Sequence, residues 1–224
     1  MILIIPDVLT PDEQSQLRLL ASQSNFVDGK ETAGFRAKLV KNNEQVAKDA
    51  SNKKQLQEIV VGALLRSKEF RRGAIPLRIR PPLISRYRPG MTYGVHVDDA
   101  LMGSSLARDR TDVSCTVFLN DAKEYEGGEL VVHSPYGIQE IKLPARYAVI
   151  YPSGTLHEVA EVTKGERLVA VTWIQSYVRD ERHRQFLYDA LQIRDKLHSI
   201  DPKMVEADTA CHLYTNLLRL WSEN

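Results

Sequence analysis

Apolar residues near the start of the chain recur at the spacing of helices. Thr10-Pro11-Asp12-Glu13 has an N-cap residue, a proline at the first helical position and a glutamate placed to close a capping box, so we expect a helix to begin here. A second apolar stripe predicts a helix over residues 51–70. We expect a short buried strand at residues 2–5, and an irregular loop with one strand at residues 27–43.

From residue 75 onward the pattern changes to short β-branched and aromatic runs separated by Gly and Pro. Such runs are typical of the strands of an all-β sandwich or barrel. The expected strands cover residues 77–80, 83–88, 93–98, 113–120, 129–133, 139–143, 147–151, 156–163 and 166–178. Tight turns are expected at residues 126–128 and 163–165.

After residue 178 the pattern becomes helical again, with two amphipathic helices expected over residues 180–197 and 202–221. The predicted fold class is therefore mainly β with flanking helices. We divide the chain into a support region (residues 1–74), a β core (residues 75–178) and a C-terminal helical appendage (residues 179–224). The leucines of this appendage favour packing on the same domain, with homodimerisation as the alternative.

Composition narrows the class of protein without naming a function. The 224 residues are 43% hydrophobic and 26% charged with a net charge of +1, which is typical of a globular chain and gives no reason to expect nucleic acid as a partner. Cys115 and Cys211 lie far apart, so no disulfide framework or thiolate metal site is indicated. We expect no signal peptide and no membrane segment, and we expect the protein in the cytoplasm.

Metal-binding chemistry is indicated by His96 and Asp98, two residues apart in an expected strand. Alternate side chains of a strand share a face, so this imidazole and carboxylate converge, whereas Asp99 points to the opposite face. Such a pair supplies two of the three ligands of a His/His/carboxylate site for non-haem Fe(II). His157 follows the turn Pro152-Ser153-Gly154 and opens a strand, so it is the candidate third ligand.

The remaining histidines fit other roles. We expect His133 to be a turn or surface residue, because it ends a strand beside Ser134-Pro135. His183, His198 and His212 fall among charged neighbours on the two C-terminal helices, where solvated side chains are expected.

The order of these residues matches a known signature. The matching motifs are Arg86-Tyr87 before Gly90, Tyr93-x-x-His96-x-Asp98, Tyr125-Glu126-Gly127-Gly128-Glu129-Leu130, Pro152-Ser153-Gly154-x-x-His157-Glu158-Val159, and Arg167 ten residues after His157. With these motifs the chain resembles the Fe(II)- and 2-oxoglutarate-dependent dioxygenases, and more closely their prolyl-hydroxylase-like branch, the PKHD-type hydroxylases. The likeness is strongest over residues 75–176, and the whole chain is similar to bacterial members associated with iron uptake.

This resemblance implies a double-stranded β-helix (jelly-roll) core in which His96, Asp98 and His157 hold Fe(II). It implies that Arg167 binds the distal carboxylate of 2-oxoglutarate, since a guanidinium makes paired charge-assisted bonds to a carboxylate. Tyr87 is a further candidate contact to the co-substrate, although a structural role fits it as well. The implied reaction is hydroxylation with release of succinate and carbon dioxide, often supported by L-ascorbate. Halogenases that resemble this group lack the carboxylate ligand, so Asp98 favours hydroxylation.

The substrate stays open, with a peptidyl residue and a small molecule linked to iron uptake as the candidates. One alternative is a nucleic-acid demethylase of the same superfamily, suggested by basic residues between Arg66 and Arg80; that branch places a second arginine where this chain has Trp173. The other alternative is a cupin-like binding module without catalysis. Residues 100–112 are equally a lid over the site or an ordinary solvated loop.

Overall fold

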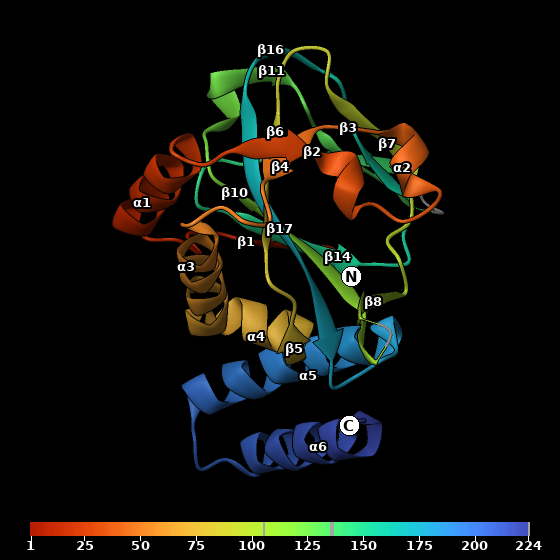
Figure 1. Ribbon diagram of the computed structural model, residues 1–224. Helices are drawn as coiled ribbons and strands as arrows, with labels where there is room; N and C mark the ends of the chain where they lie inside the picture. Colours follow the sequence, from red (N-terminus) through yellow and green to blue (C-terminus); the bar gives the residue numbers. More distant parts are fainter. Residues whose placement is uncertain (105, 135–136, 224) are drawn as a thin grey trace.

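Two sheets face each other in the computed structural model, which describes residues 1–104, 106–134 and 137–223 (Figure 1). The larger sheet runs in the order β1 (Leu3–Ile5), β14 (Ala148–Pro152), β10 (Val113–Phe118), β17 (Arg167–Ser176), β6 (Leu83–Tyr87), β4 (Glu44–Val46) and β2 (Phe26–Asp28), and β5 (Pro76–Ile79) pairs with β17. The smaller sheet runs β13 (Gly137–Ile141), β12 (Leu130–Ser134), β15 (His157–Val159), β7 (Thr92–His96) and β3 (Lys41–Asn42). The predicted mainly β class with flanking helices is therefore confirmed.

The side chains of strand β17 pack on both faces of the larger sheet. Leu168, Ala170 and Ile174 are buried on the face covered by helices, whereas Val169 is buried between the two sheets. This alternation follows from the two-residue period of a strand. The same parity directs Arg167 and the other odd-numbered residues of β17 toward the space between the sheets.

Three N-terminal helices pack on the outer face of the larger sheet: α1 (Pro11–Ser22), α3 (Lys53–Arg66) and α4 (Lys68–Ala74). The capping box of α1 is confirmed, since Thr10 Oγ1 accepts from Glu13 N at 3.2 Å and Glu13 Oε2 accepts from Thr10 N at 2.8 Å. The prediction of a single helix over residues 51–70 is wrong, because α3 and α4 are separate helices. Ser67 is extended (φ −66°, ψ 118°) and caps α4 by accepting from Phe70 N, so its capping preference interrupts the helical pattern.

Residues 27–43 contain more structure than one strand. After β2 come a 3₁₀ turn (Gly29–Thr32), α2 (Ala37–Val40) and β3, so this segment joins both sheets. The N-terminal region thus supplies strands to the core, and the domain boundaries drawn at residues 74 and 178 stay a prediction.

Two further expectations need correction. The run at residues 156–163 splits into β15 and β16 (Val162–Gly165), and the expected turn at residues 163–165 is part of β16, which pairs with β11 (Tyr125–Gly127). Gly127 has φ +72°, and a Cβ there would lie 2.0 Å from the carbonyl oxygen of Glu161, so glycine is required for this pairing. In place of the loop expected at residues 100–112, β8 (Leu101–Ser104) and β9 (Ala107–Arg110) form a hairpin; Ser105 of that loop lies outside the described residues.

The two C-terminal helices are confirmed as α5 (Glu181–Ile200) and α6 (Val205–Trp221). Helix α5 packs beside α4, where Tyr188 Oη donates to Glu69 at 2.9 Å and Arg72 pairs with Asp195. Helix α6 lies against α5 on the side away from the sheets (Figure 1). No helix in the described parts of the chain is long and apolar enough to span a membrane.

Candidate active site

A cavity of about 740 Å³, including its open mouth, lies between the two sheets. Its walls come from the larger sheet, the smaller sheet, the segment after β7 and the N-terminal residues around α2. All five residues singled out from the sequence line it: Tyr87, His96, Asp98, His157 and Arg167.

His96, Asp98 and His157 come together at one point of this cavity. His96 ends β7 and pairs across the smaller sheet with His157, the first residue of β15. One ligand atom from each of the three residues lies within 4.8 Å of the others, and Asp98 Oδ2 is 3.7 Å from His157 Nε2. Asp98 lies just beyond the end of β7, yet it is the carboxylate that faces the histidines. The donor set therefore fits a metal ion with a His/His/carboxylate preference.

Asp99 also lines the cavity, but its carboxylate is not grouped with the two histidines. Its carboxylate packs against Gly34, where a Cβ would lie 2.3 Å from Asp99 Oδ2. Its carbonyl oxygen accepts a hydrogen bond from Thr111 Oγ1 at 2.5 Å.

Backbone carbonyls orient both imidazoles. His96 Nδ1 lies 2.8 Å from Gly94 O, and His157 Nδ1 lies 2.9 Å from Thr155 O. Because a carbonyl oxygen only accepts, Nδ1 carries the proton in each ring, and each Nε2 keeps a lone pair free for a metal.

Ser114 holds the Asp98 carboxylate and Ser153 lies behind Ser114; sequence reasoning missed the roles of both. Ser114 Oγ on β10 donates to Asp98 Oδ2 at 2.5 Å and lies 2.8 Å from Ser153 Oγ, a group able to donate to it in turn. Both serines are buried. No local signal points to them, because the contact forms only when strands distant in sequence meet.

Aromatic rings enclose the histidine pair. Tyr93 stacks on His96 with ring centroids 3.6 Å apart, and Tyr151 meets His157 edge-on at 5.1 Å. Burial, helped by the neighbouring His157, lowers the pKa of His96 to about 4. The His96 ring is thus neutral at pH 7, the state in which it binds a metal.

Arg167 lies deep in the cavity and is 1% exposed. It is paired in register with Tyr87, and its guanidinium carbon lies 5.1 Å from the centre of the Tyr87 ring. Arg167 Nε has no hydrogen-bond partner, and within the described residues no carboxylate lies within 4.0 Å of the guanidinium. A buried cation without an anion is costly, so this position fits the carboxylate of a ligand. Tyr87 is itself buried, and burial raises its pKa.

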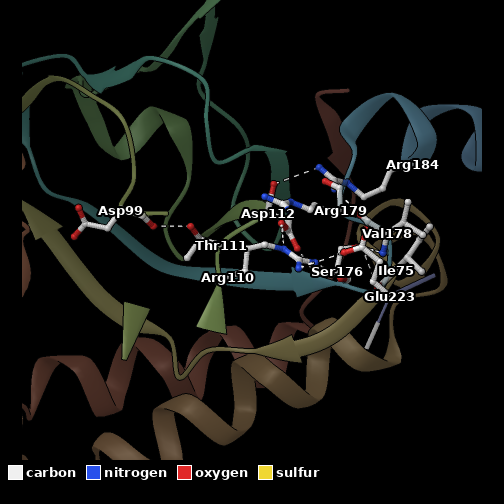
Figure 2. Close-up of polar contacts among 10 residues, drawn as sticks. All are labelled: Ile75, Asp99, Arg110, Thr111, Asp112, Ser176, Val178, Arg179, Arg184 and Glu223. Carbon is white, nitrogen blue, oxygen red and sulfur yellow. Dashed lines mark hydrogen bonds and ion pairs between the residues drawn. The ribbon is translucent and has the colours of Figure 1, made fainter. Parts of the chain in front are cut away.

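Figure 2 shows the polar contacts that join Arg184 of helix α5 to the segment around Asp112. Arg184 of α5 is buried and donates through Nη2 to Asp112 O at 3.3 Å, the same carbonyl that accepts from Ser153 N at 3.2 Å. The Asp112 carboxylate accepts from Arg110 Nε at 2.7 Å and Ser176 N at 2.8 Å. Helix α5 therefore supports the segment from which Ser153 reaches toward Ser114.

The other candidates lie outside this site. His133 lies within β12 and is half-buried, with Nε2 3.2 Å from Glu158 Oε1, so it is neither in a turn nor fully exposed. His183 is not simply solvated, because it stacks on Trp221 with centroids 4.2 Å apart.

The basic residues between Arg66 and Arg80 are not a free phosphate-binding surface. Arg66 pairs with Glu13 at 2.7 Å and Arg80 with Asp109 at 2.8 Å. Lys68, Arg72 and Arg78 also pair with carboxylates, whereas Arg71 has no carboxylate within 4.0 Å in the described parts of the chain. Five of these six basic residues are therefore already paired, which leaves little free charge for a nucleic acid.

Comparison with known proteins defines the class. The sequence profile of the 2OG-Fe(II) oxygenase superfamily matches residues 82–175. In fold, the chain is similar to the crystal structure of a Pseudomonas putida prolyl-4-hydroxylase (TM-score 0.53, 18% identity, 78% of this chain and 92% of that chain). It is also similar to HygX from Streptomyces hygroscopicus with nickel and 2-oxoglutarate bound (TM-score 0.56, 13% identity, 78% and 82%). The jelly-roll prediction is confirmed.

Closer relatives narrow this class. A PKHD-type hydroxylase of Thermosynechococcus vestitus is 46% identical over 223 residues, covering all of both chains. The chain belongs to the PKHD-type hydroxylases, a group of 2OG-Fe(II) oxygenases, and it is an oxygenase of the hydroxylase type.

Proposed function

We propose that this enzyme hydroxylates its substrate with Fe(II), dioxygen and 2-oxoglutarate, releasing succinate and carbon dioxide. The observation that carries the proposal is that one cavity combines a His/His/carboxylate cluster with a buried arginine that lacks an anion. A metal ion and a dicarboxylate would satisfy both features at once.

In this proposal His96, Asp98 and His157 would hold the iron. Bound Fe(II) and 2-oxoglutarate supply the oxidative chemistry, and the protein orients them. Arg167 Nη and Nε groups donate to the distal carboxylate, and the buried Tyr87 beside it is a second contact. Ser114 donates to Asp98 and keeps its carboxylate in position. Val171 and Trp173 line the same cavity and exclude water from the ion pair that Arg167 forms.

The substrate is a peptidyl residue or a small molecule, with a link to iron uptake as one candidate. We also propose that L-ascorbate supports turnover by keeping the iron reduced and that the enzyme acts in the cytoplasm. The cupin-like alternative predicts no succinate formation. The demethylase alternative loses its support, since Trp173 stands where that branch has a second arginine and most of the neighbouring basic residues are paired.

Anaerobic titration tests the proposal. Protein with Fe(II) and 2-oxoglutarate should develop a visible metal-to-ligand charge-transfer band, and air should then yield succinate. His96→Ala should abolish the band, whereas the control His133→Ala should keep it, because His133 lies outside the cavity. Absence of the band in the wild-type protein would contradict the proposal.

We further propose that two copies associate through the C-terminal helices. Support comes from large apolar side chains that are 53–73% exposed along these helices: Phe186, Ile193, Ile200, Leu213 and Leu220. On α5 they recur every seven residues, as in a helix-pairing seam. Light scattering should show a dimer for the wild type and for Gln192→Glu but a monomer for Ile193→Glu; a monomeric wild type would disprove this association.

A further inference from the structure

Lys41 is a second buried cation in the active-site cavity. It begins β3, the edge strand that pairs with the metal-binding strand β7, and it is 5% exposed. It lines the same cavity as the metal-binding cluster and Arg167. The two cations come from different walls, since Arg167 belongs to the larger sheet and Lys41 to the smaller one.

The ammonium group has few partners. Lys41 Nζ donates to Thr32 Oγ1 at 3.2 Å and lies 5.1 Å from the centre of the Tyr93 ring, which stacks on His96. In the part of the chain that the structure describes, no carboxylate lies within 4.0 Å of Nζ. An ammonium has three N–H donors, so most of its hydrogen-bonding capacity faces the cavity.

Burying the Lys41 ammonium costs free energy, and contacts within the protein do not offset this cost. Burial lowers the pKa of Lys41 to about 8 despite the opposing charges of Asp98 and Asp28, so the group is still mainly protonated at pH 7. A side chain of similar length without charge would fill the same space without that cost. Thr32 does not depend on the lysine, because its hydroxyl also lies 2.5 Å from Gln45 Oε1 and 3.1 Å from Gly29 O.

A second unused donor faces the same cavity. Trp173 Nε1 on β17 is buried and has no hydrogen-bond partner among the residues that the structure describes, and Trp173 lines the cavity. A buried ammonium with a single hydroxyl acceptor and a buried indole N–H with none, from opposite sheets, indicate that the cavity is built for a ligand with acceptor atoms.

We propose that Lys41 binds an acidic group, such as a carboxylate, of the substrate that is hydroxylated, and that Trp173 Nε1 donates to the same ligand. This inference rests on the proposed function, in which Arg167 binds the distal carboxylate of 2-oxoglutarate. The other carboxylate of the co-substrate would bind the metal held by His96, Asp98 and His157. Both carboxylates of 2-oxoglutarate then have partners other than Lys41. Lys41 is therefore free to select for negative charge in the substrate that is hydroxylated. A neutral analogue leaves the ammonium unpaired and is rejected.

Benzoate and benzamide test this selection, because they match in size and differ in charge. Calorimetric titrations into anaerobic protein with Fe(II) and 2-oxoglutarate should give benzoate at least about tenfold higher affinity than benzamide, as expected for a buried charge pair. Lys41→Met and Lys41→Gln should remove the preference by weakening benzoate alone, and Lys41→Arg should retain part of it. Equal affinities in the wild type, no binding of either probe, or an unchanged preference in Lys41→Met would each overturn the proposal.

The charge-transfer band separates this proposal from the proposed function. A wild type without the band refutes the oxygenase chemistry, whereas a wild type with the band but without benzoate preference refutes only the role of Lys41. The variants should keep the band and bind 2-oxoglutarate within about twofold of the wild type, a change well below that of a lost ion pair. A tenfold loss of 2-oxoglutarate affinity in both Lys41→Met and Lys41→Gln would assign the lysine to the co-substrate and overturn the proposal. If Lys41→Met does not fold, Lys41→Gln tests the proposal in its place, because its amide N–H can still donate to Thr32.

Discussion

The metal-binding cluster and the two buried cations of the cavity are held in opposite ways. Each group of the cluster has a partner from the chain: Gly94 O for His96, Thr155 O for His157 and Ser114 Oγ for Asp98. Arg167 has an unpartnered Nε, and Lys41 has one hydroxyl partner. Under the proposed function, this difference means that the candidate metal ligands are oriented before a metal binds, whereas the two cations would be stabilised by anionic ligands.

Removal of a metal ligand should have the largest effect. We expect Asp98→Ala to lower Fe(II) affinity by more than about 100-fold, since loss of a ligand exceeds the 10–100-fold typical of its hydrogen-bond partners. Anaerobic metal titration measures this affinity. The neighbouring Asp99→Ala is the matched control and should change it by less than about threefold. Comparable losses in the two variants would show that strand parity selected the wrong carboxylate.

Removal of Arg167 should separate ligand binding from folding. We expect Arg167→Met to lower the affinity for 2-oxoglutarate by at least about 30-fold, because the distal carboxylate loses its buried charge partner. The ligand-free variant should be more stable than the wild type by about 1–3 kcal/mol, because an unpaired buried charge is gone. Calorimetric titration and denaturant unfolding measure the two effects. Arg88→Met, on an exposed arginine near the same strand end, should change neither; a destabilised Arg167→Met would mean that the chain itself pairs this cation.

Removal of the hydroxyl behind the carboxylate should have a moderate effect. We expect Ser114→Ala to weaken metal binding by about tenfold, the lower end of the range for groups that orient a metal ligand. Affinity for 2-oxoglutarate at saturating metal should stay unchanged. Ser85→Ala is the matched control, since Ser85 lines the same cavity but accepts from Gln45 Nε2 at 3.0 Å and lies away from the metal ligands. Equal losses in both variants would point to general loosening of the cavity.

Residue order and spacing in the sequence singled out His96, Asp98, His157 and Arg167, and the structure brings all four into one cavity. Their roles as metal ligands and as a co-substrate contact stay a prediction. The capping box at Thr10 was also predictable, since its residues are four apart at most. Ser114 and Lys41 were not predictable, because they reach the site only through pairing of β10 with β17 and of β3 with β7. Ser67 shows that helix boundaries are hard to predict from the apolar pattern alone. The apolar stripe continues across Ser67, but Ser67 caps a new helix and so divides the expected one.

Protonation of His96 gives the most specific test of preorganisation. The folded pKa is about 4, below the ordinary value of 6.5, so between pH 6.5 and pH 4 the unfolded chain takes up a proton that the folded chain refuses. The free energy of unfolding of the metal-free protein should therefore be highest above pH 6.5. It should fall by roughly 3 kcal/mol at most as the pH drops from 6.5 to 4.

The ring itself reports this shift directly. In the metal-free protein, the NMR resonance of His96, assigned with His96→Gln, should change little between pH 7 and pH 5 while a histidine in an unfolded reference peptide titrates. A midpoint near 6.5 would mean that the His96 ring is solvated before metal arrives. His96 would then not be oriented before metal binding, because the metal would have to displace a proton and order the ring. The difference between the oriented His96, Asp98 and His157 and the unpaired cations would not hold for this residue.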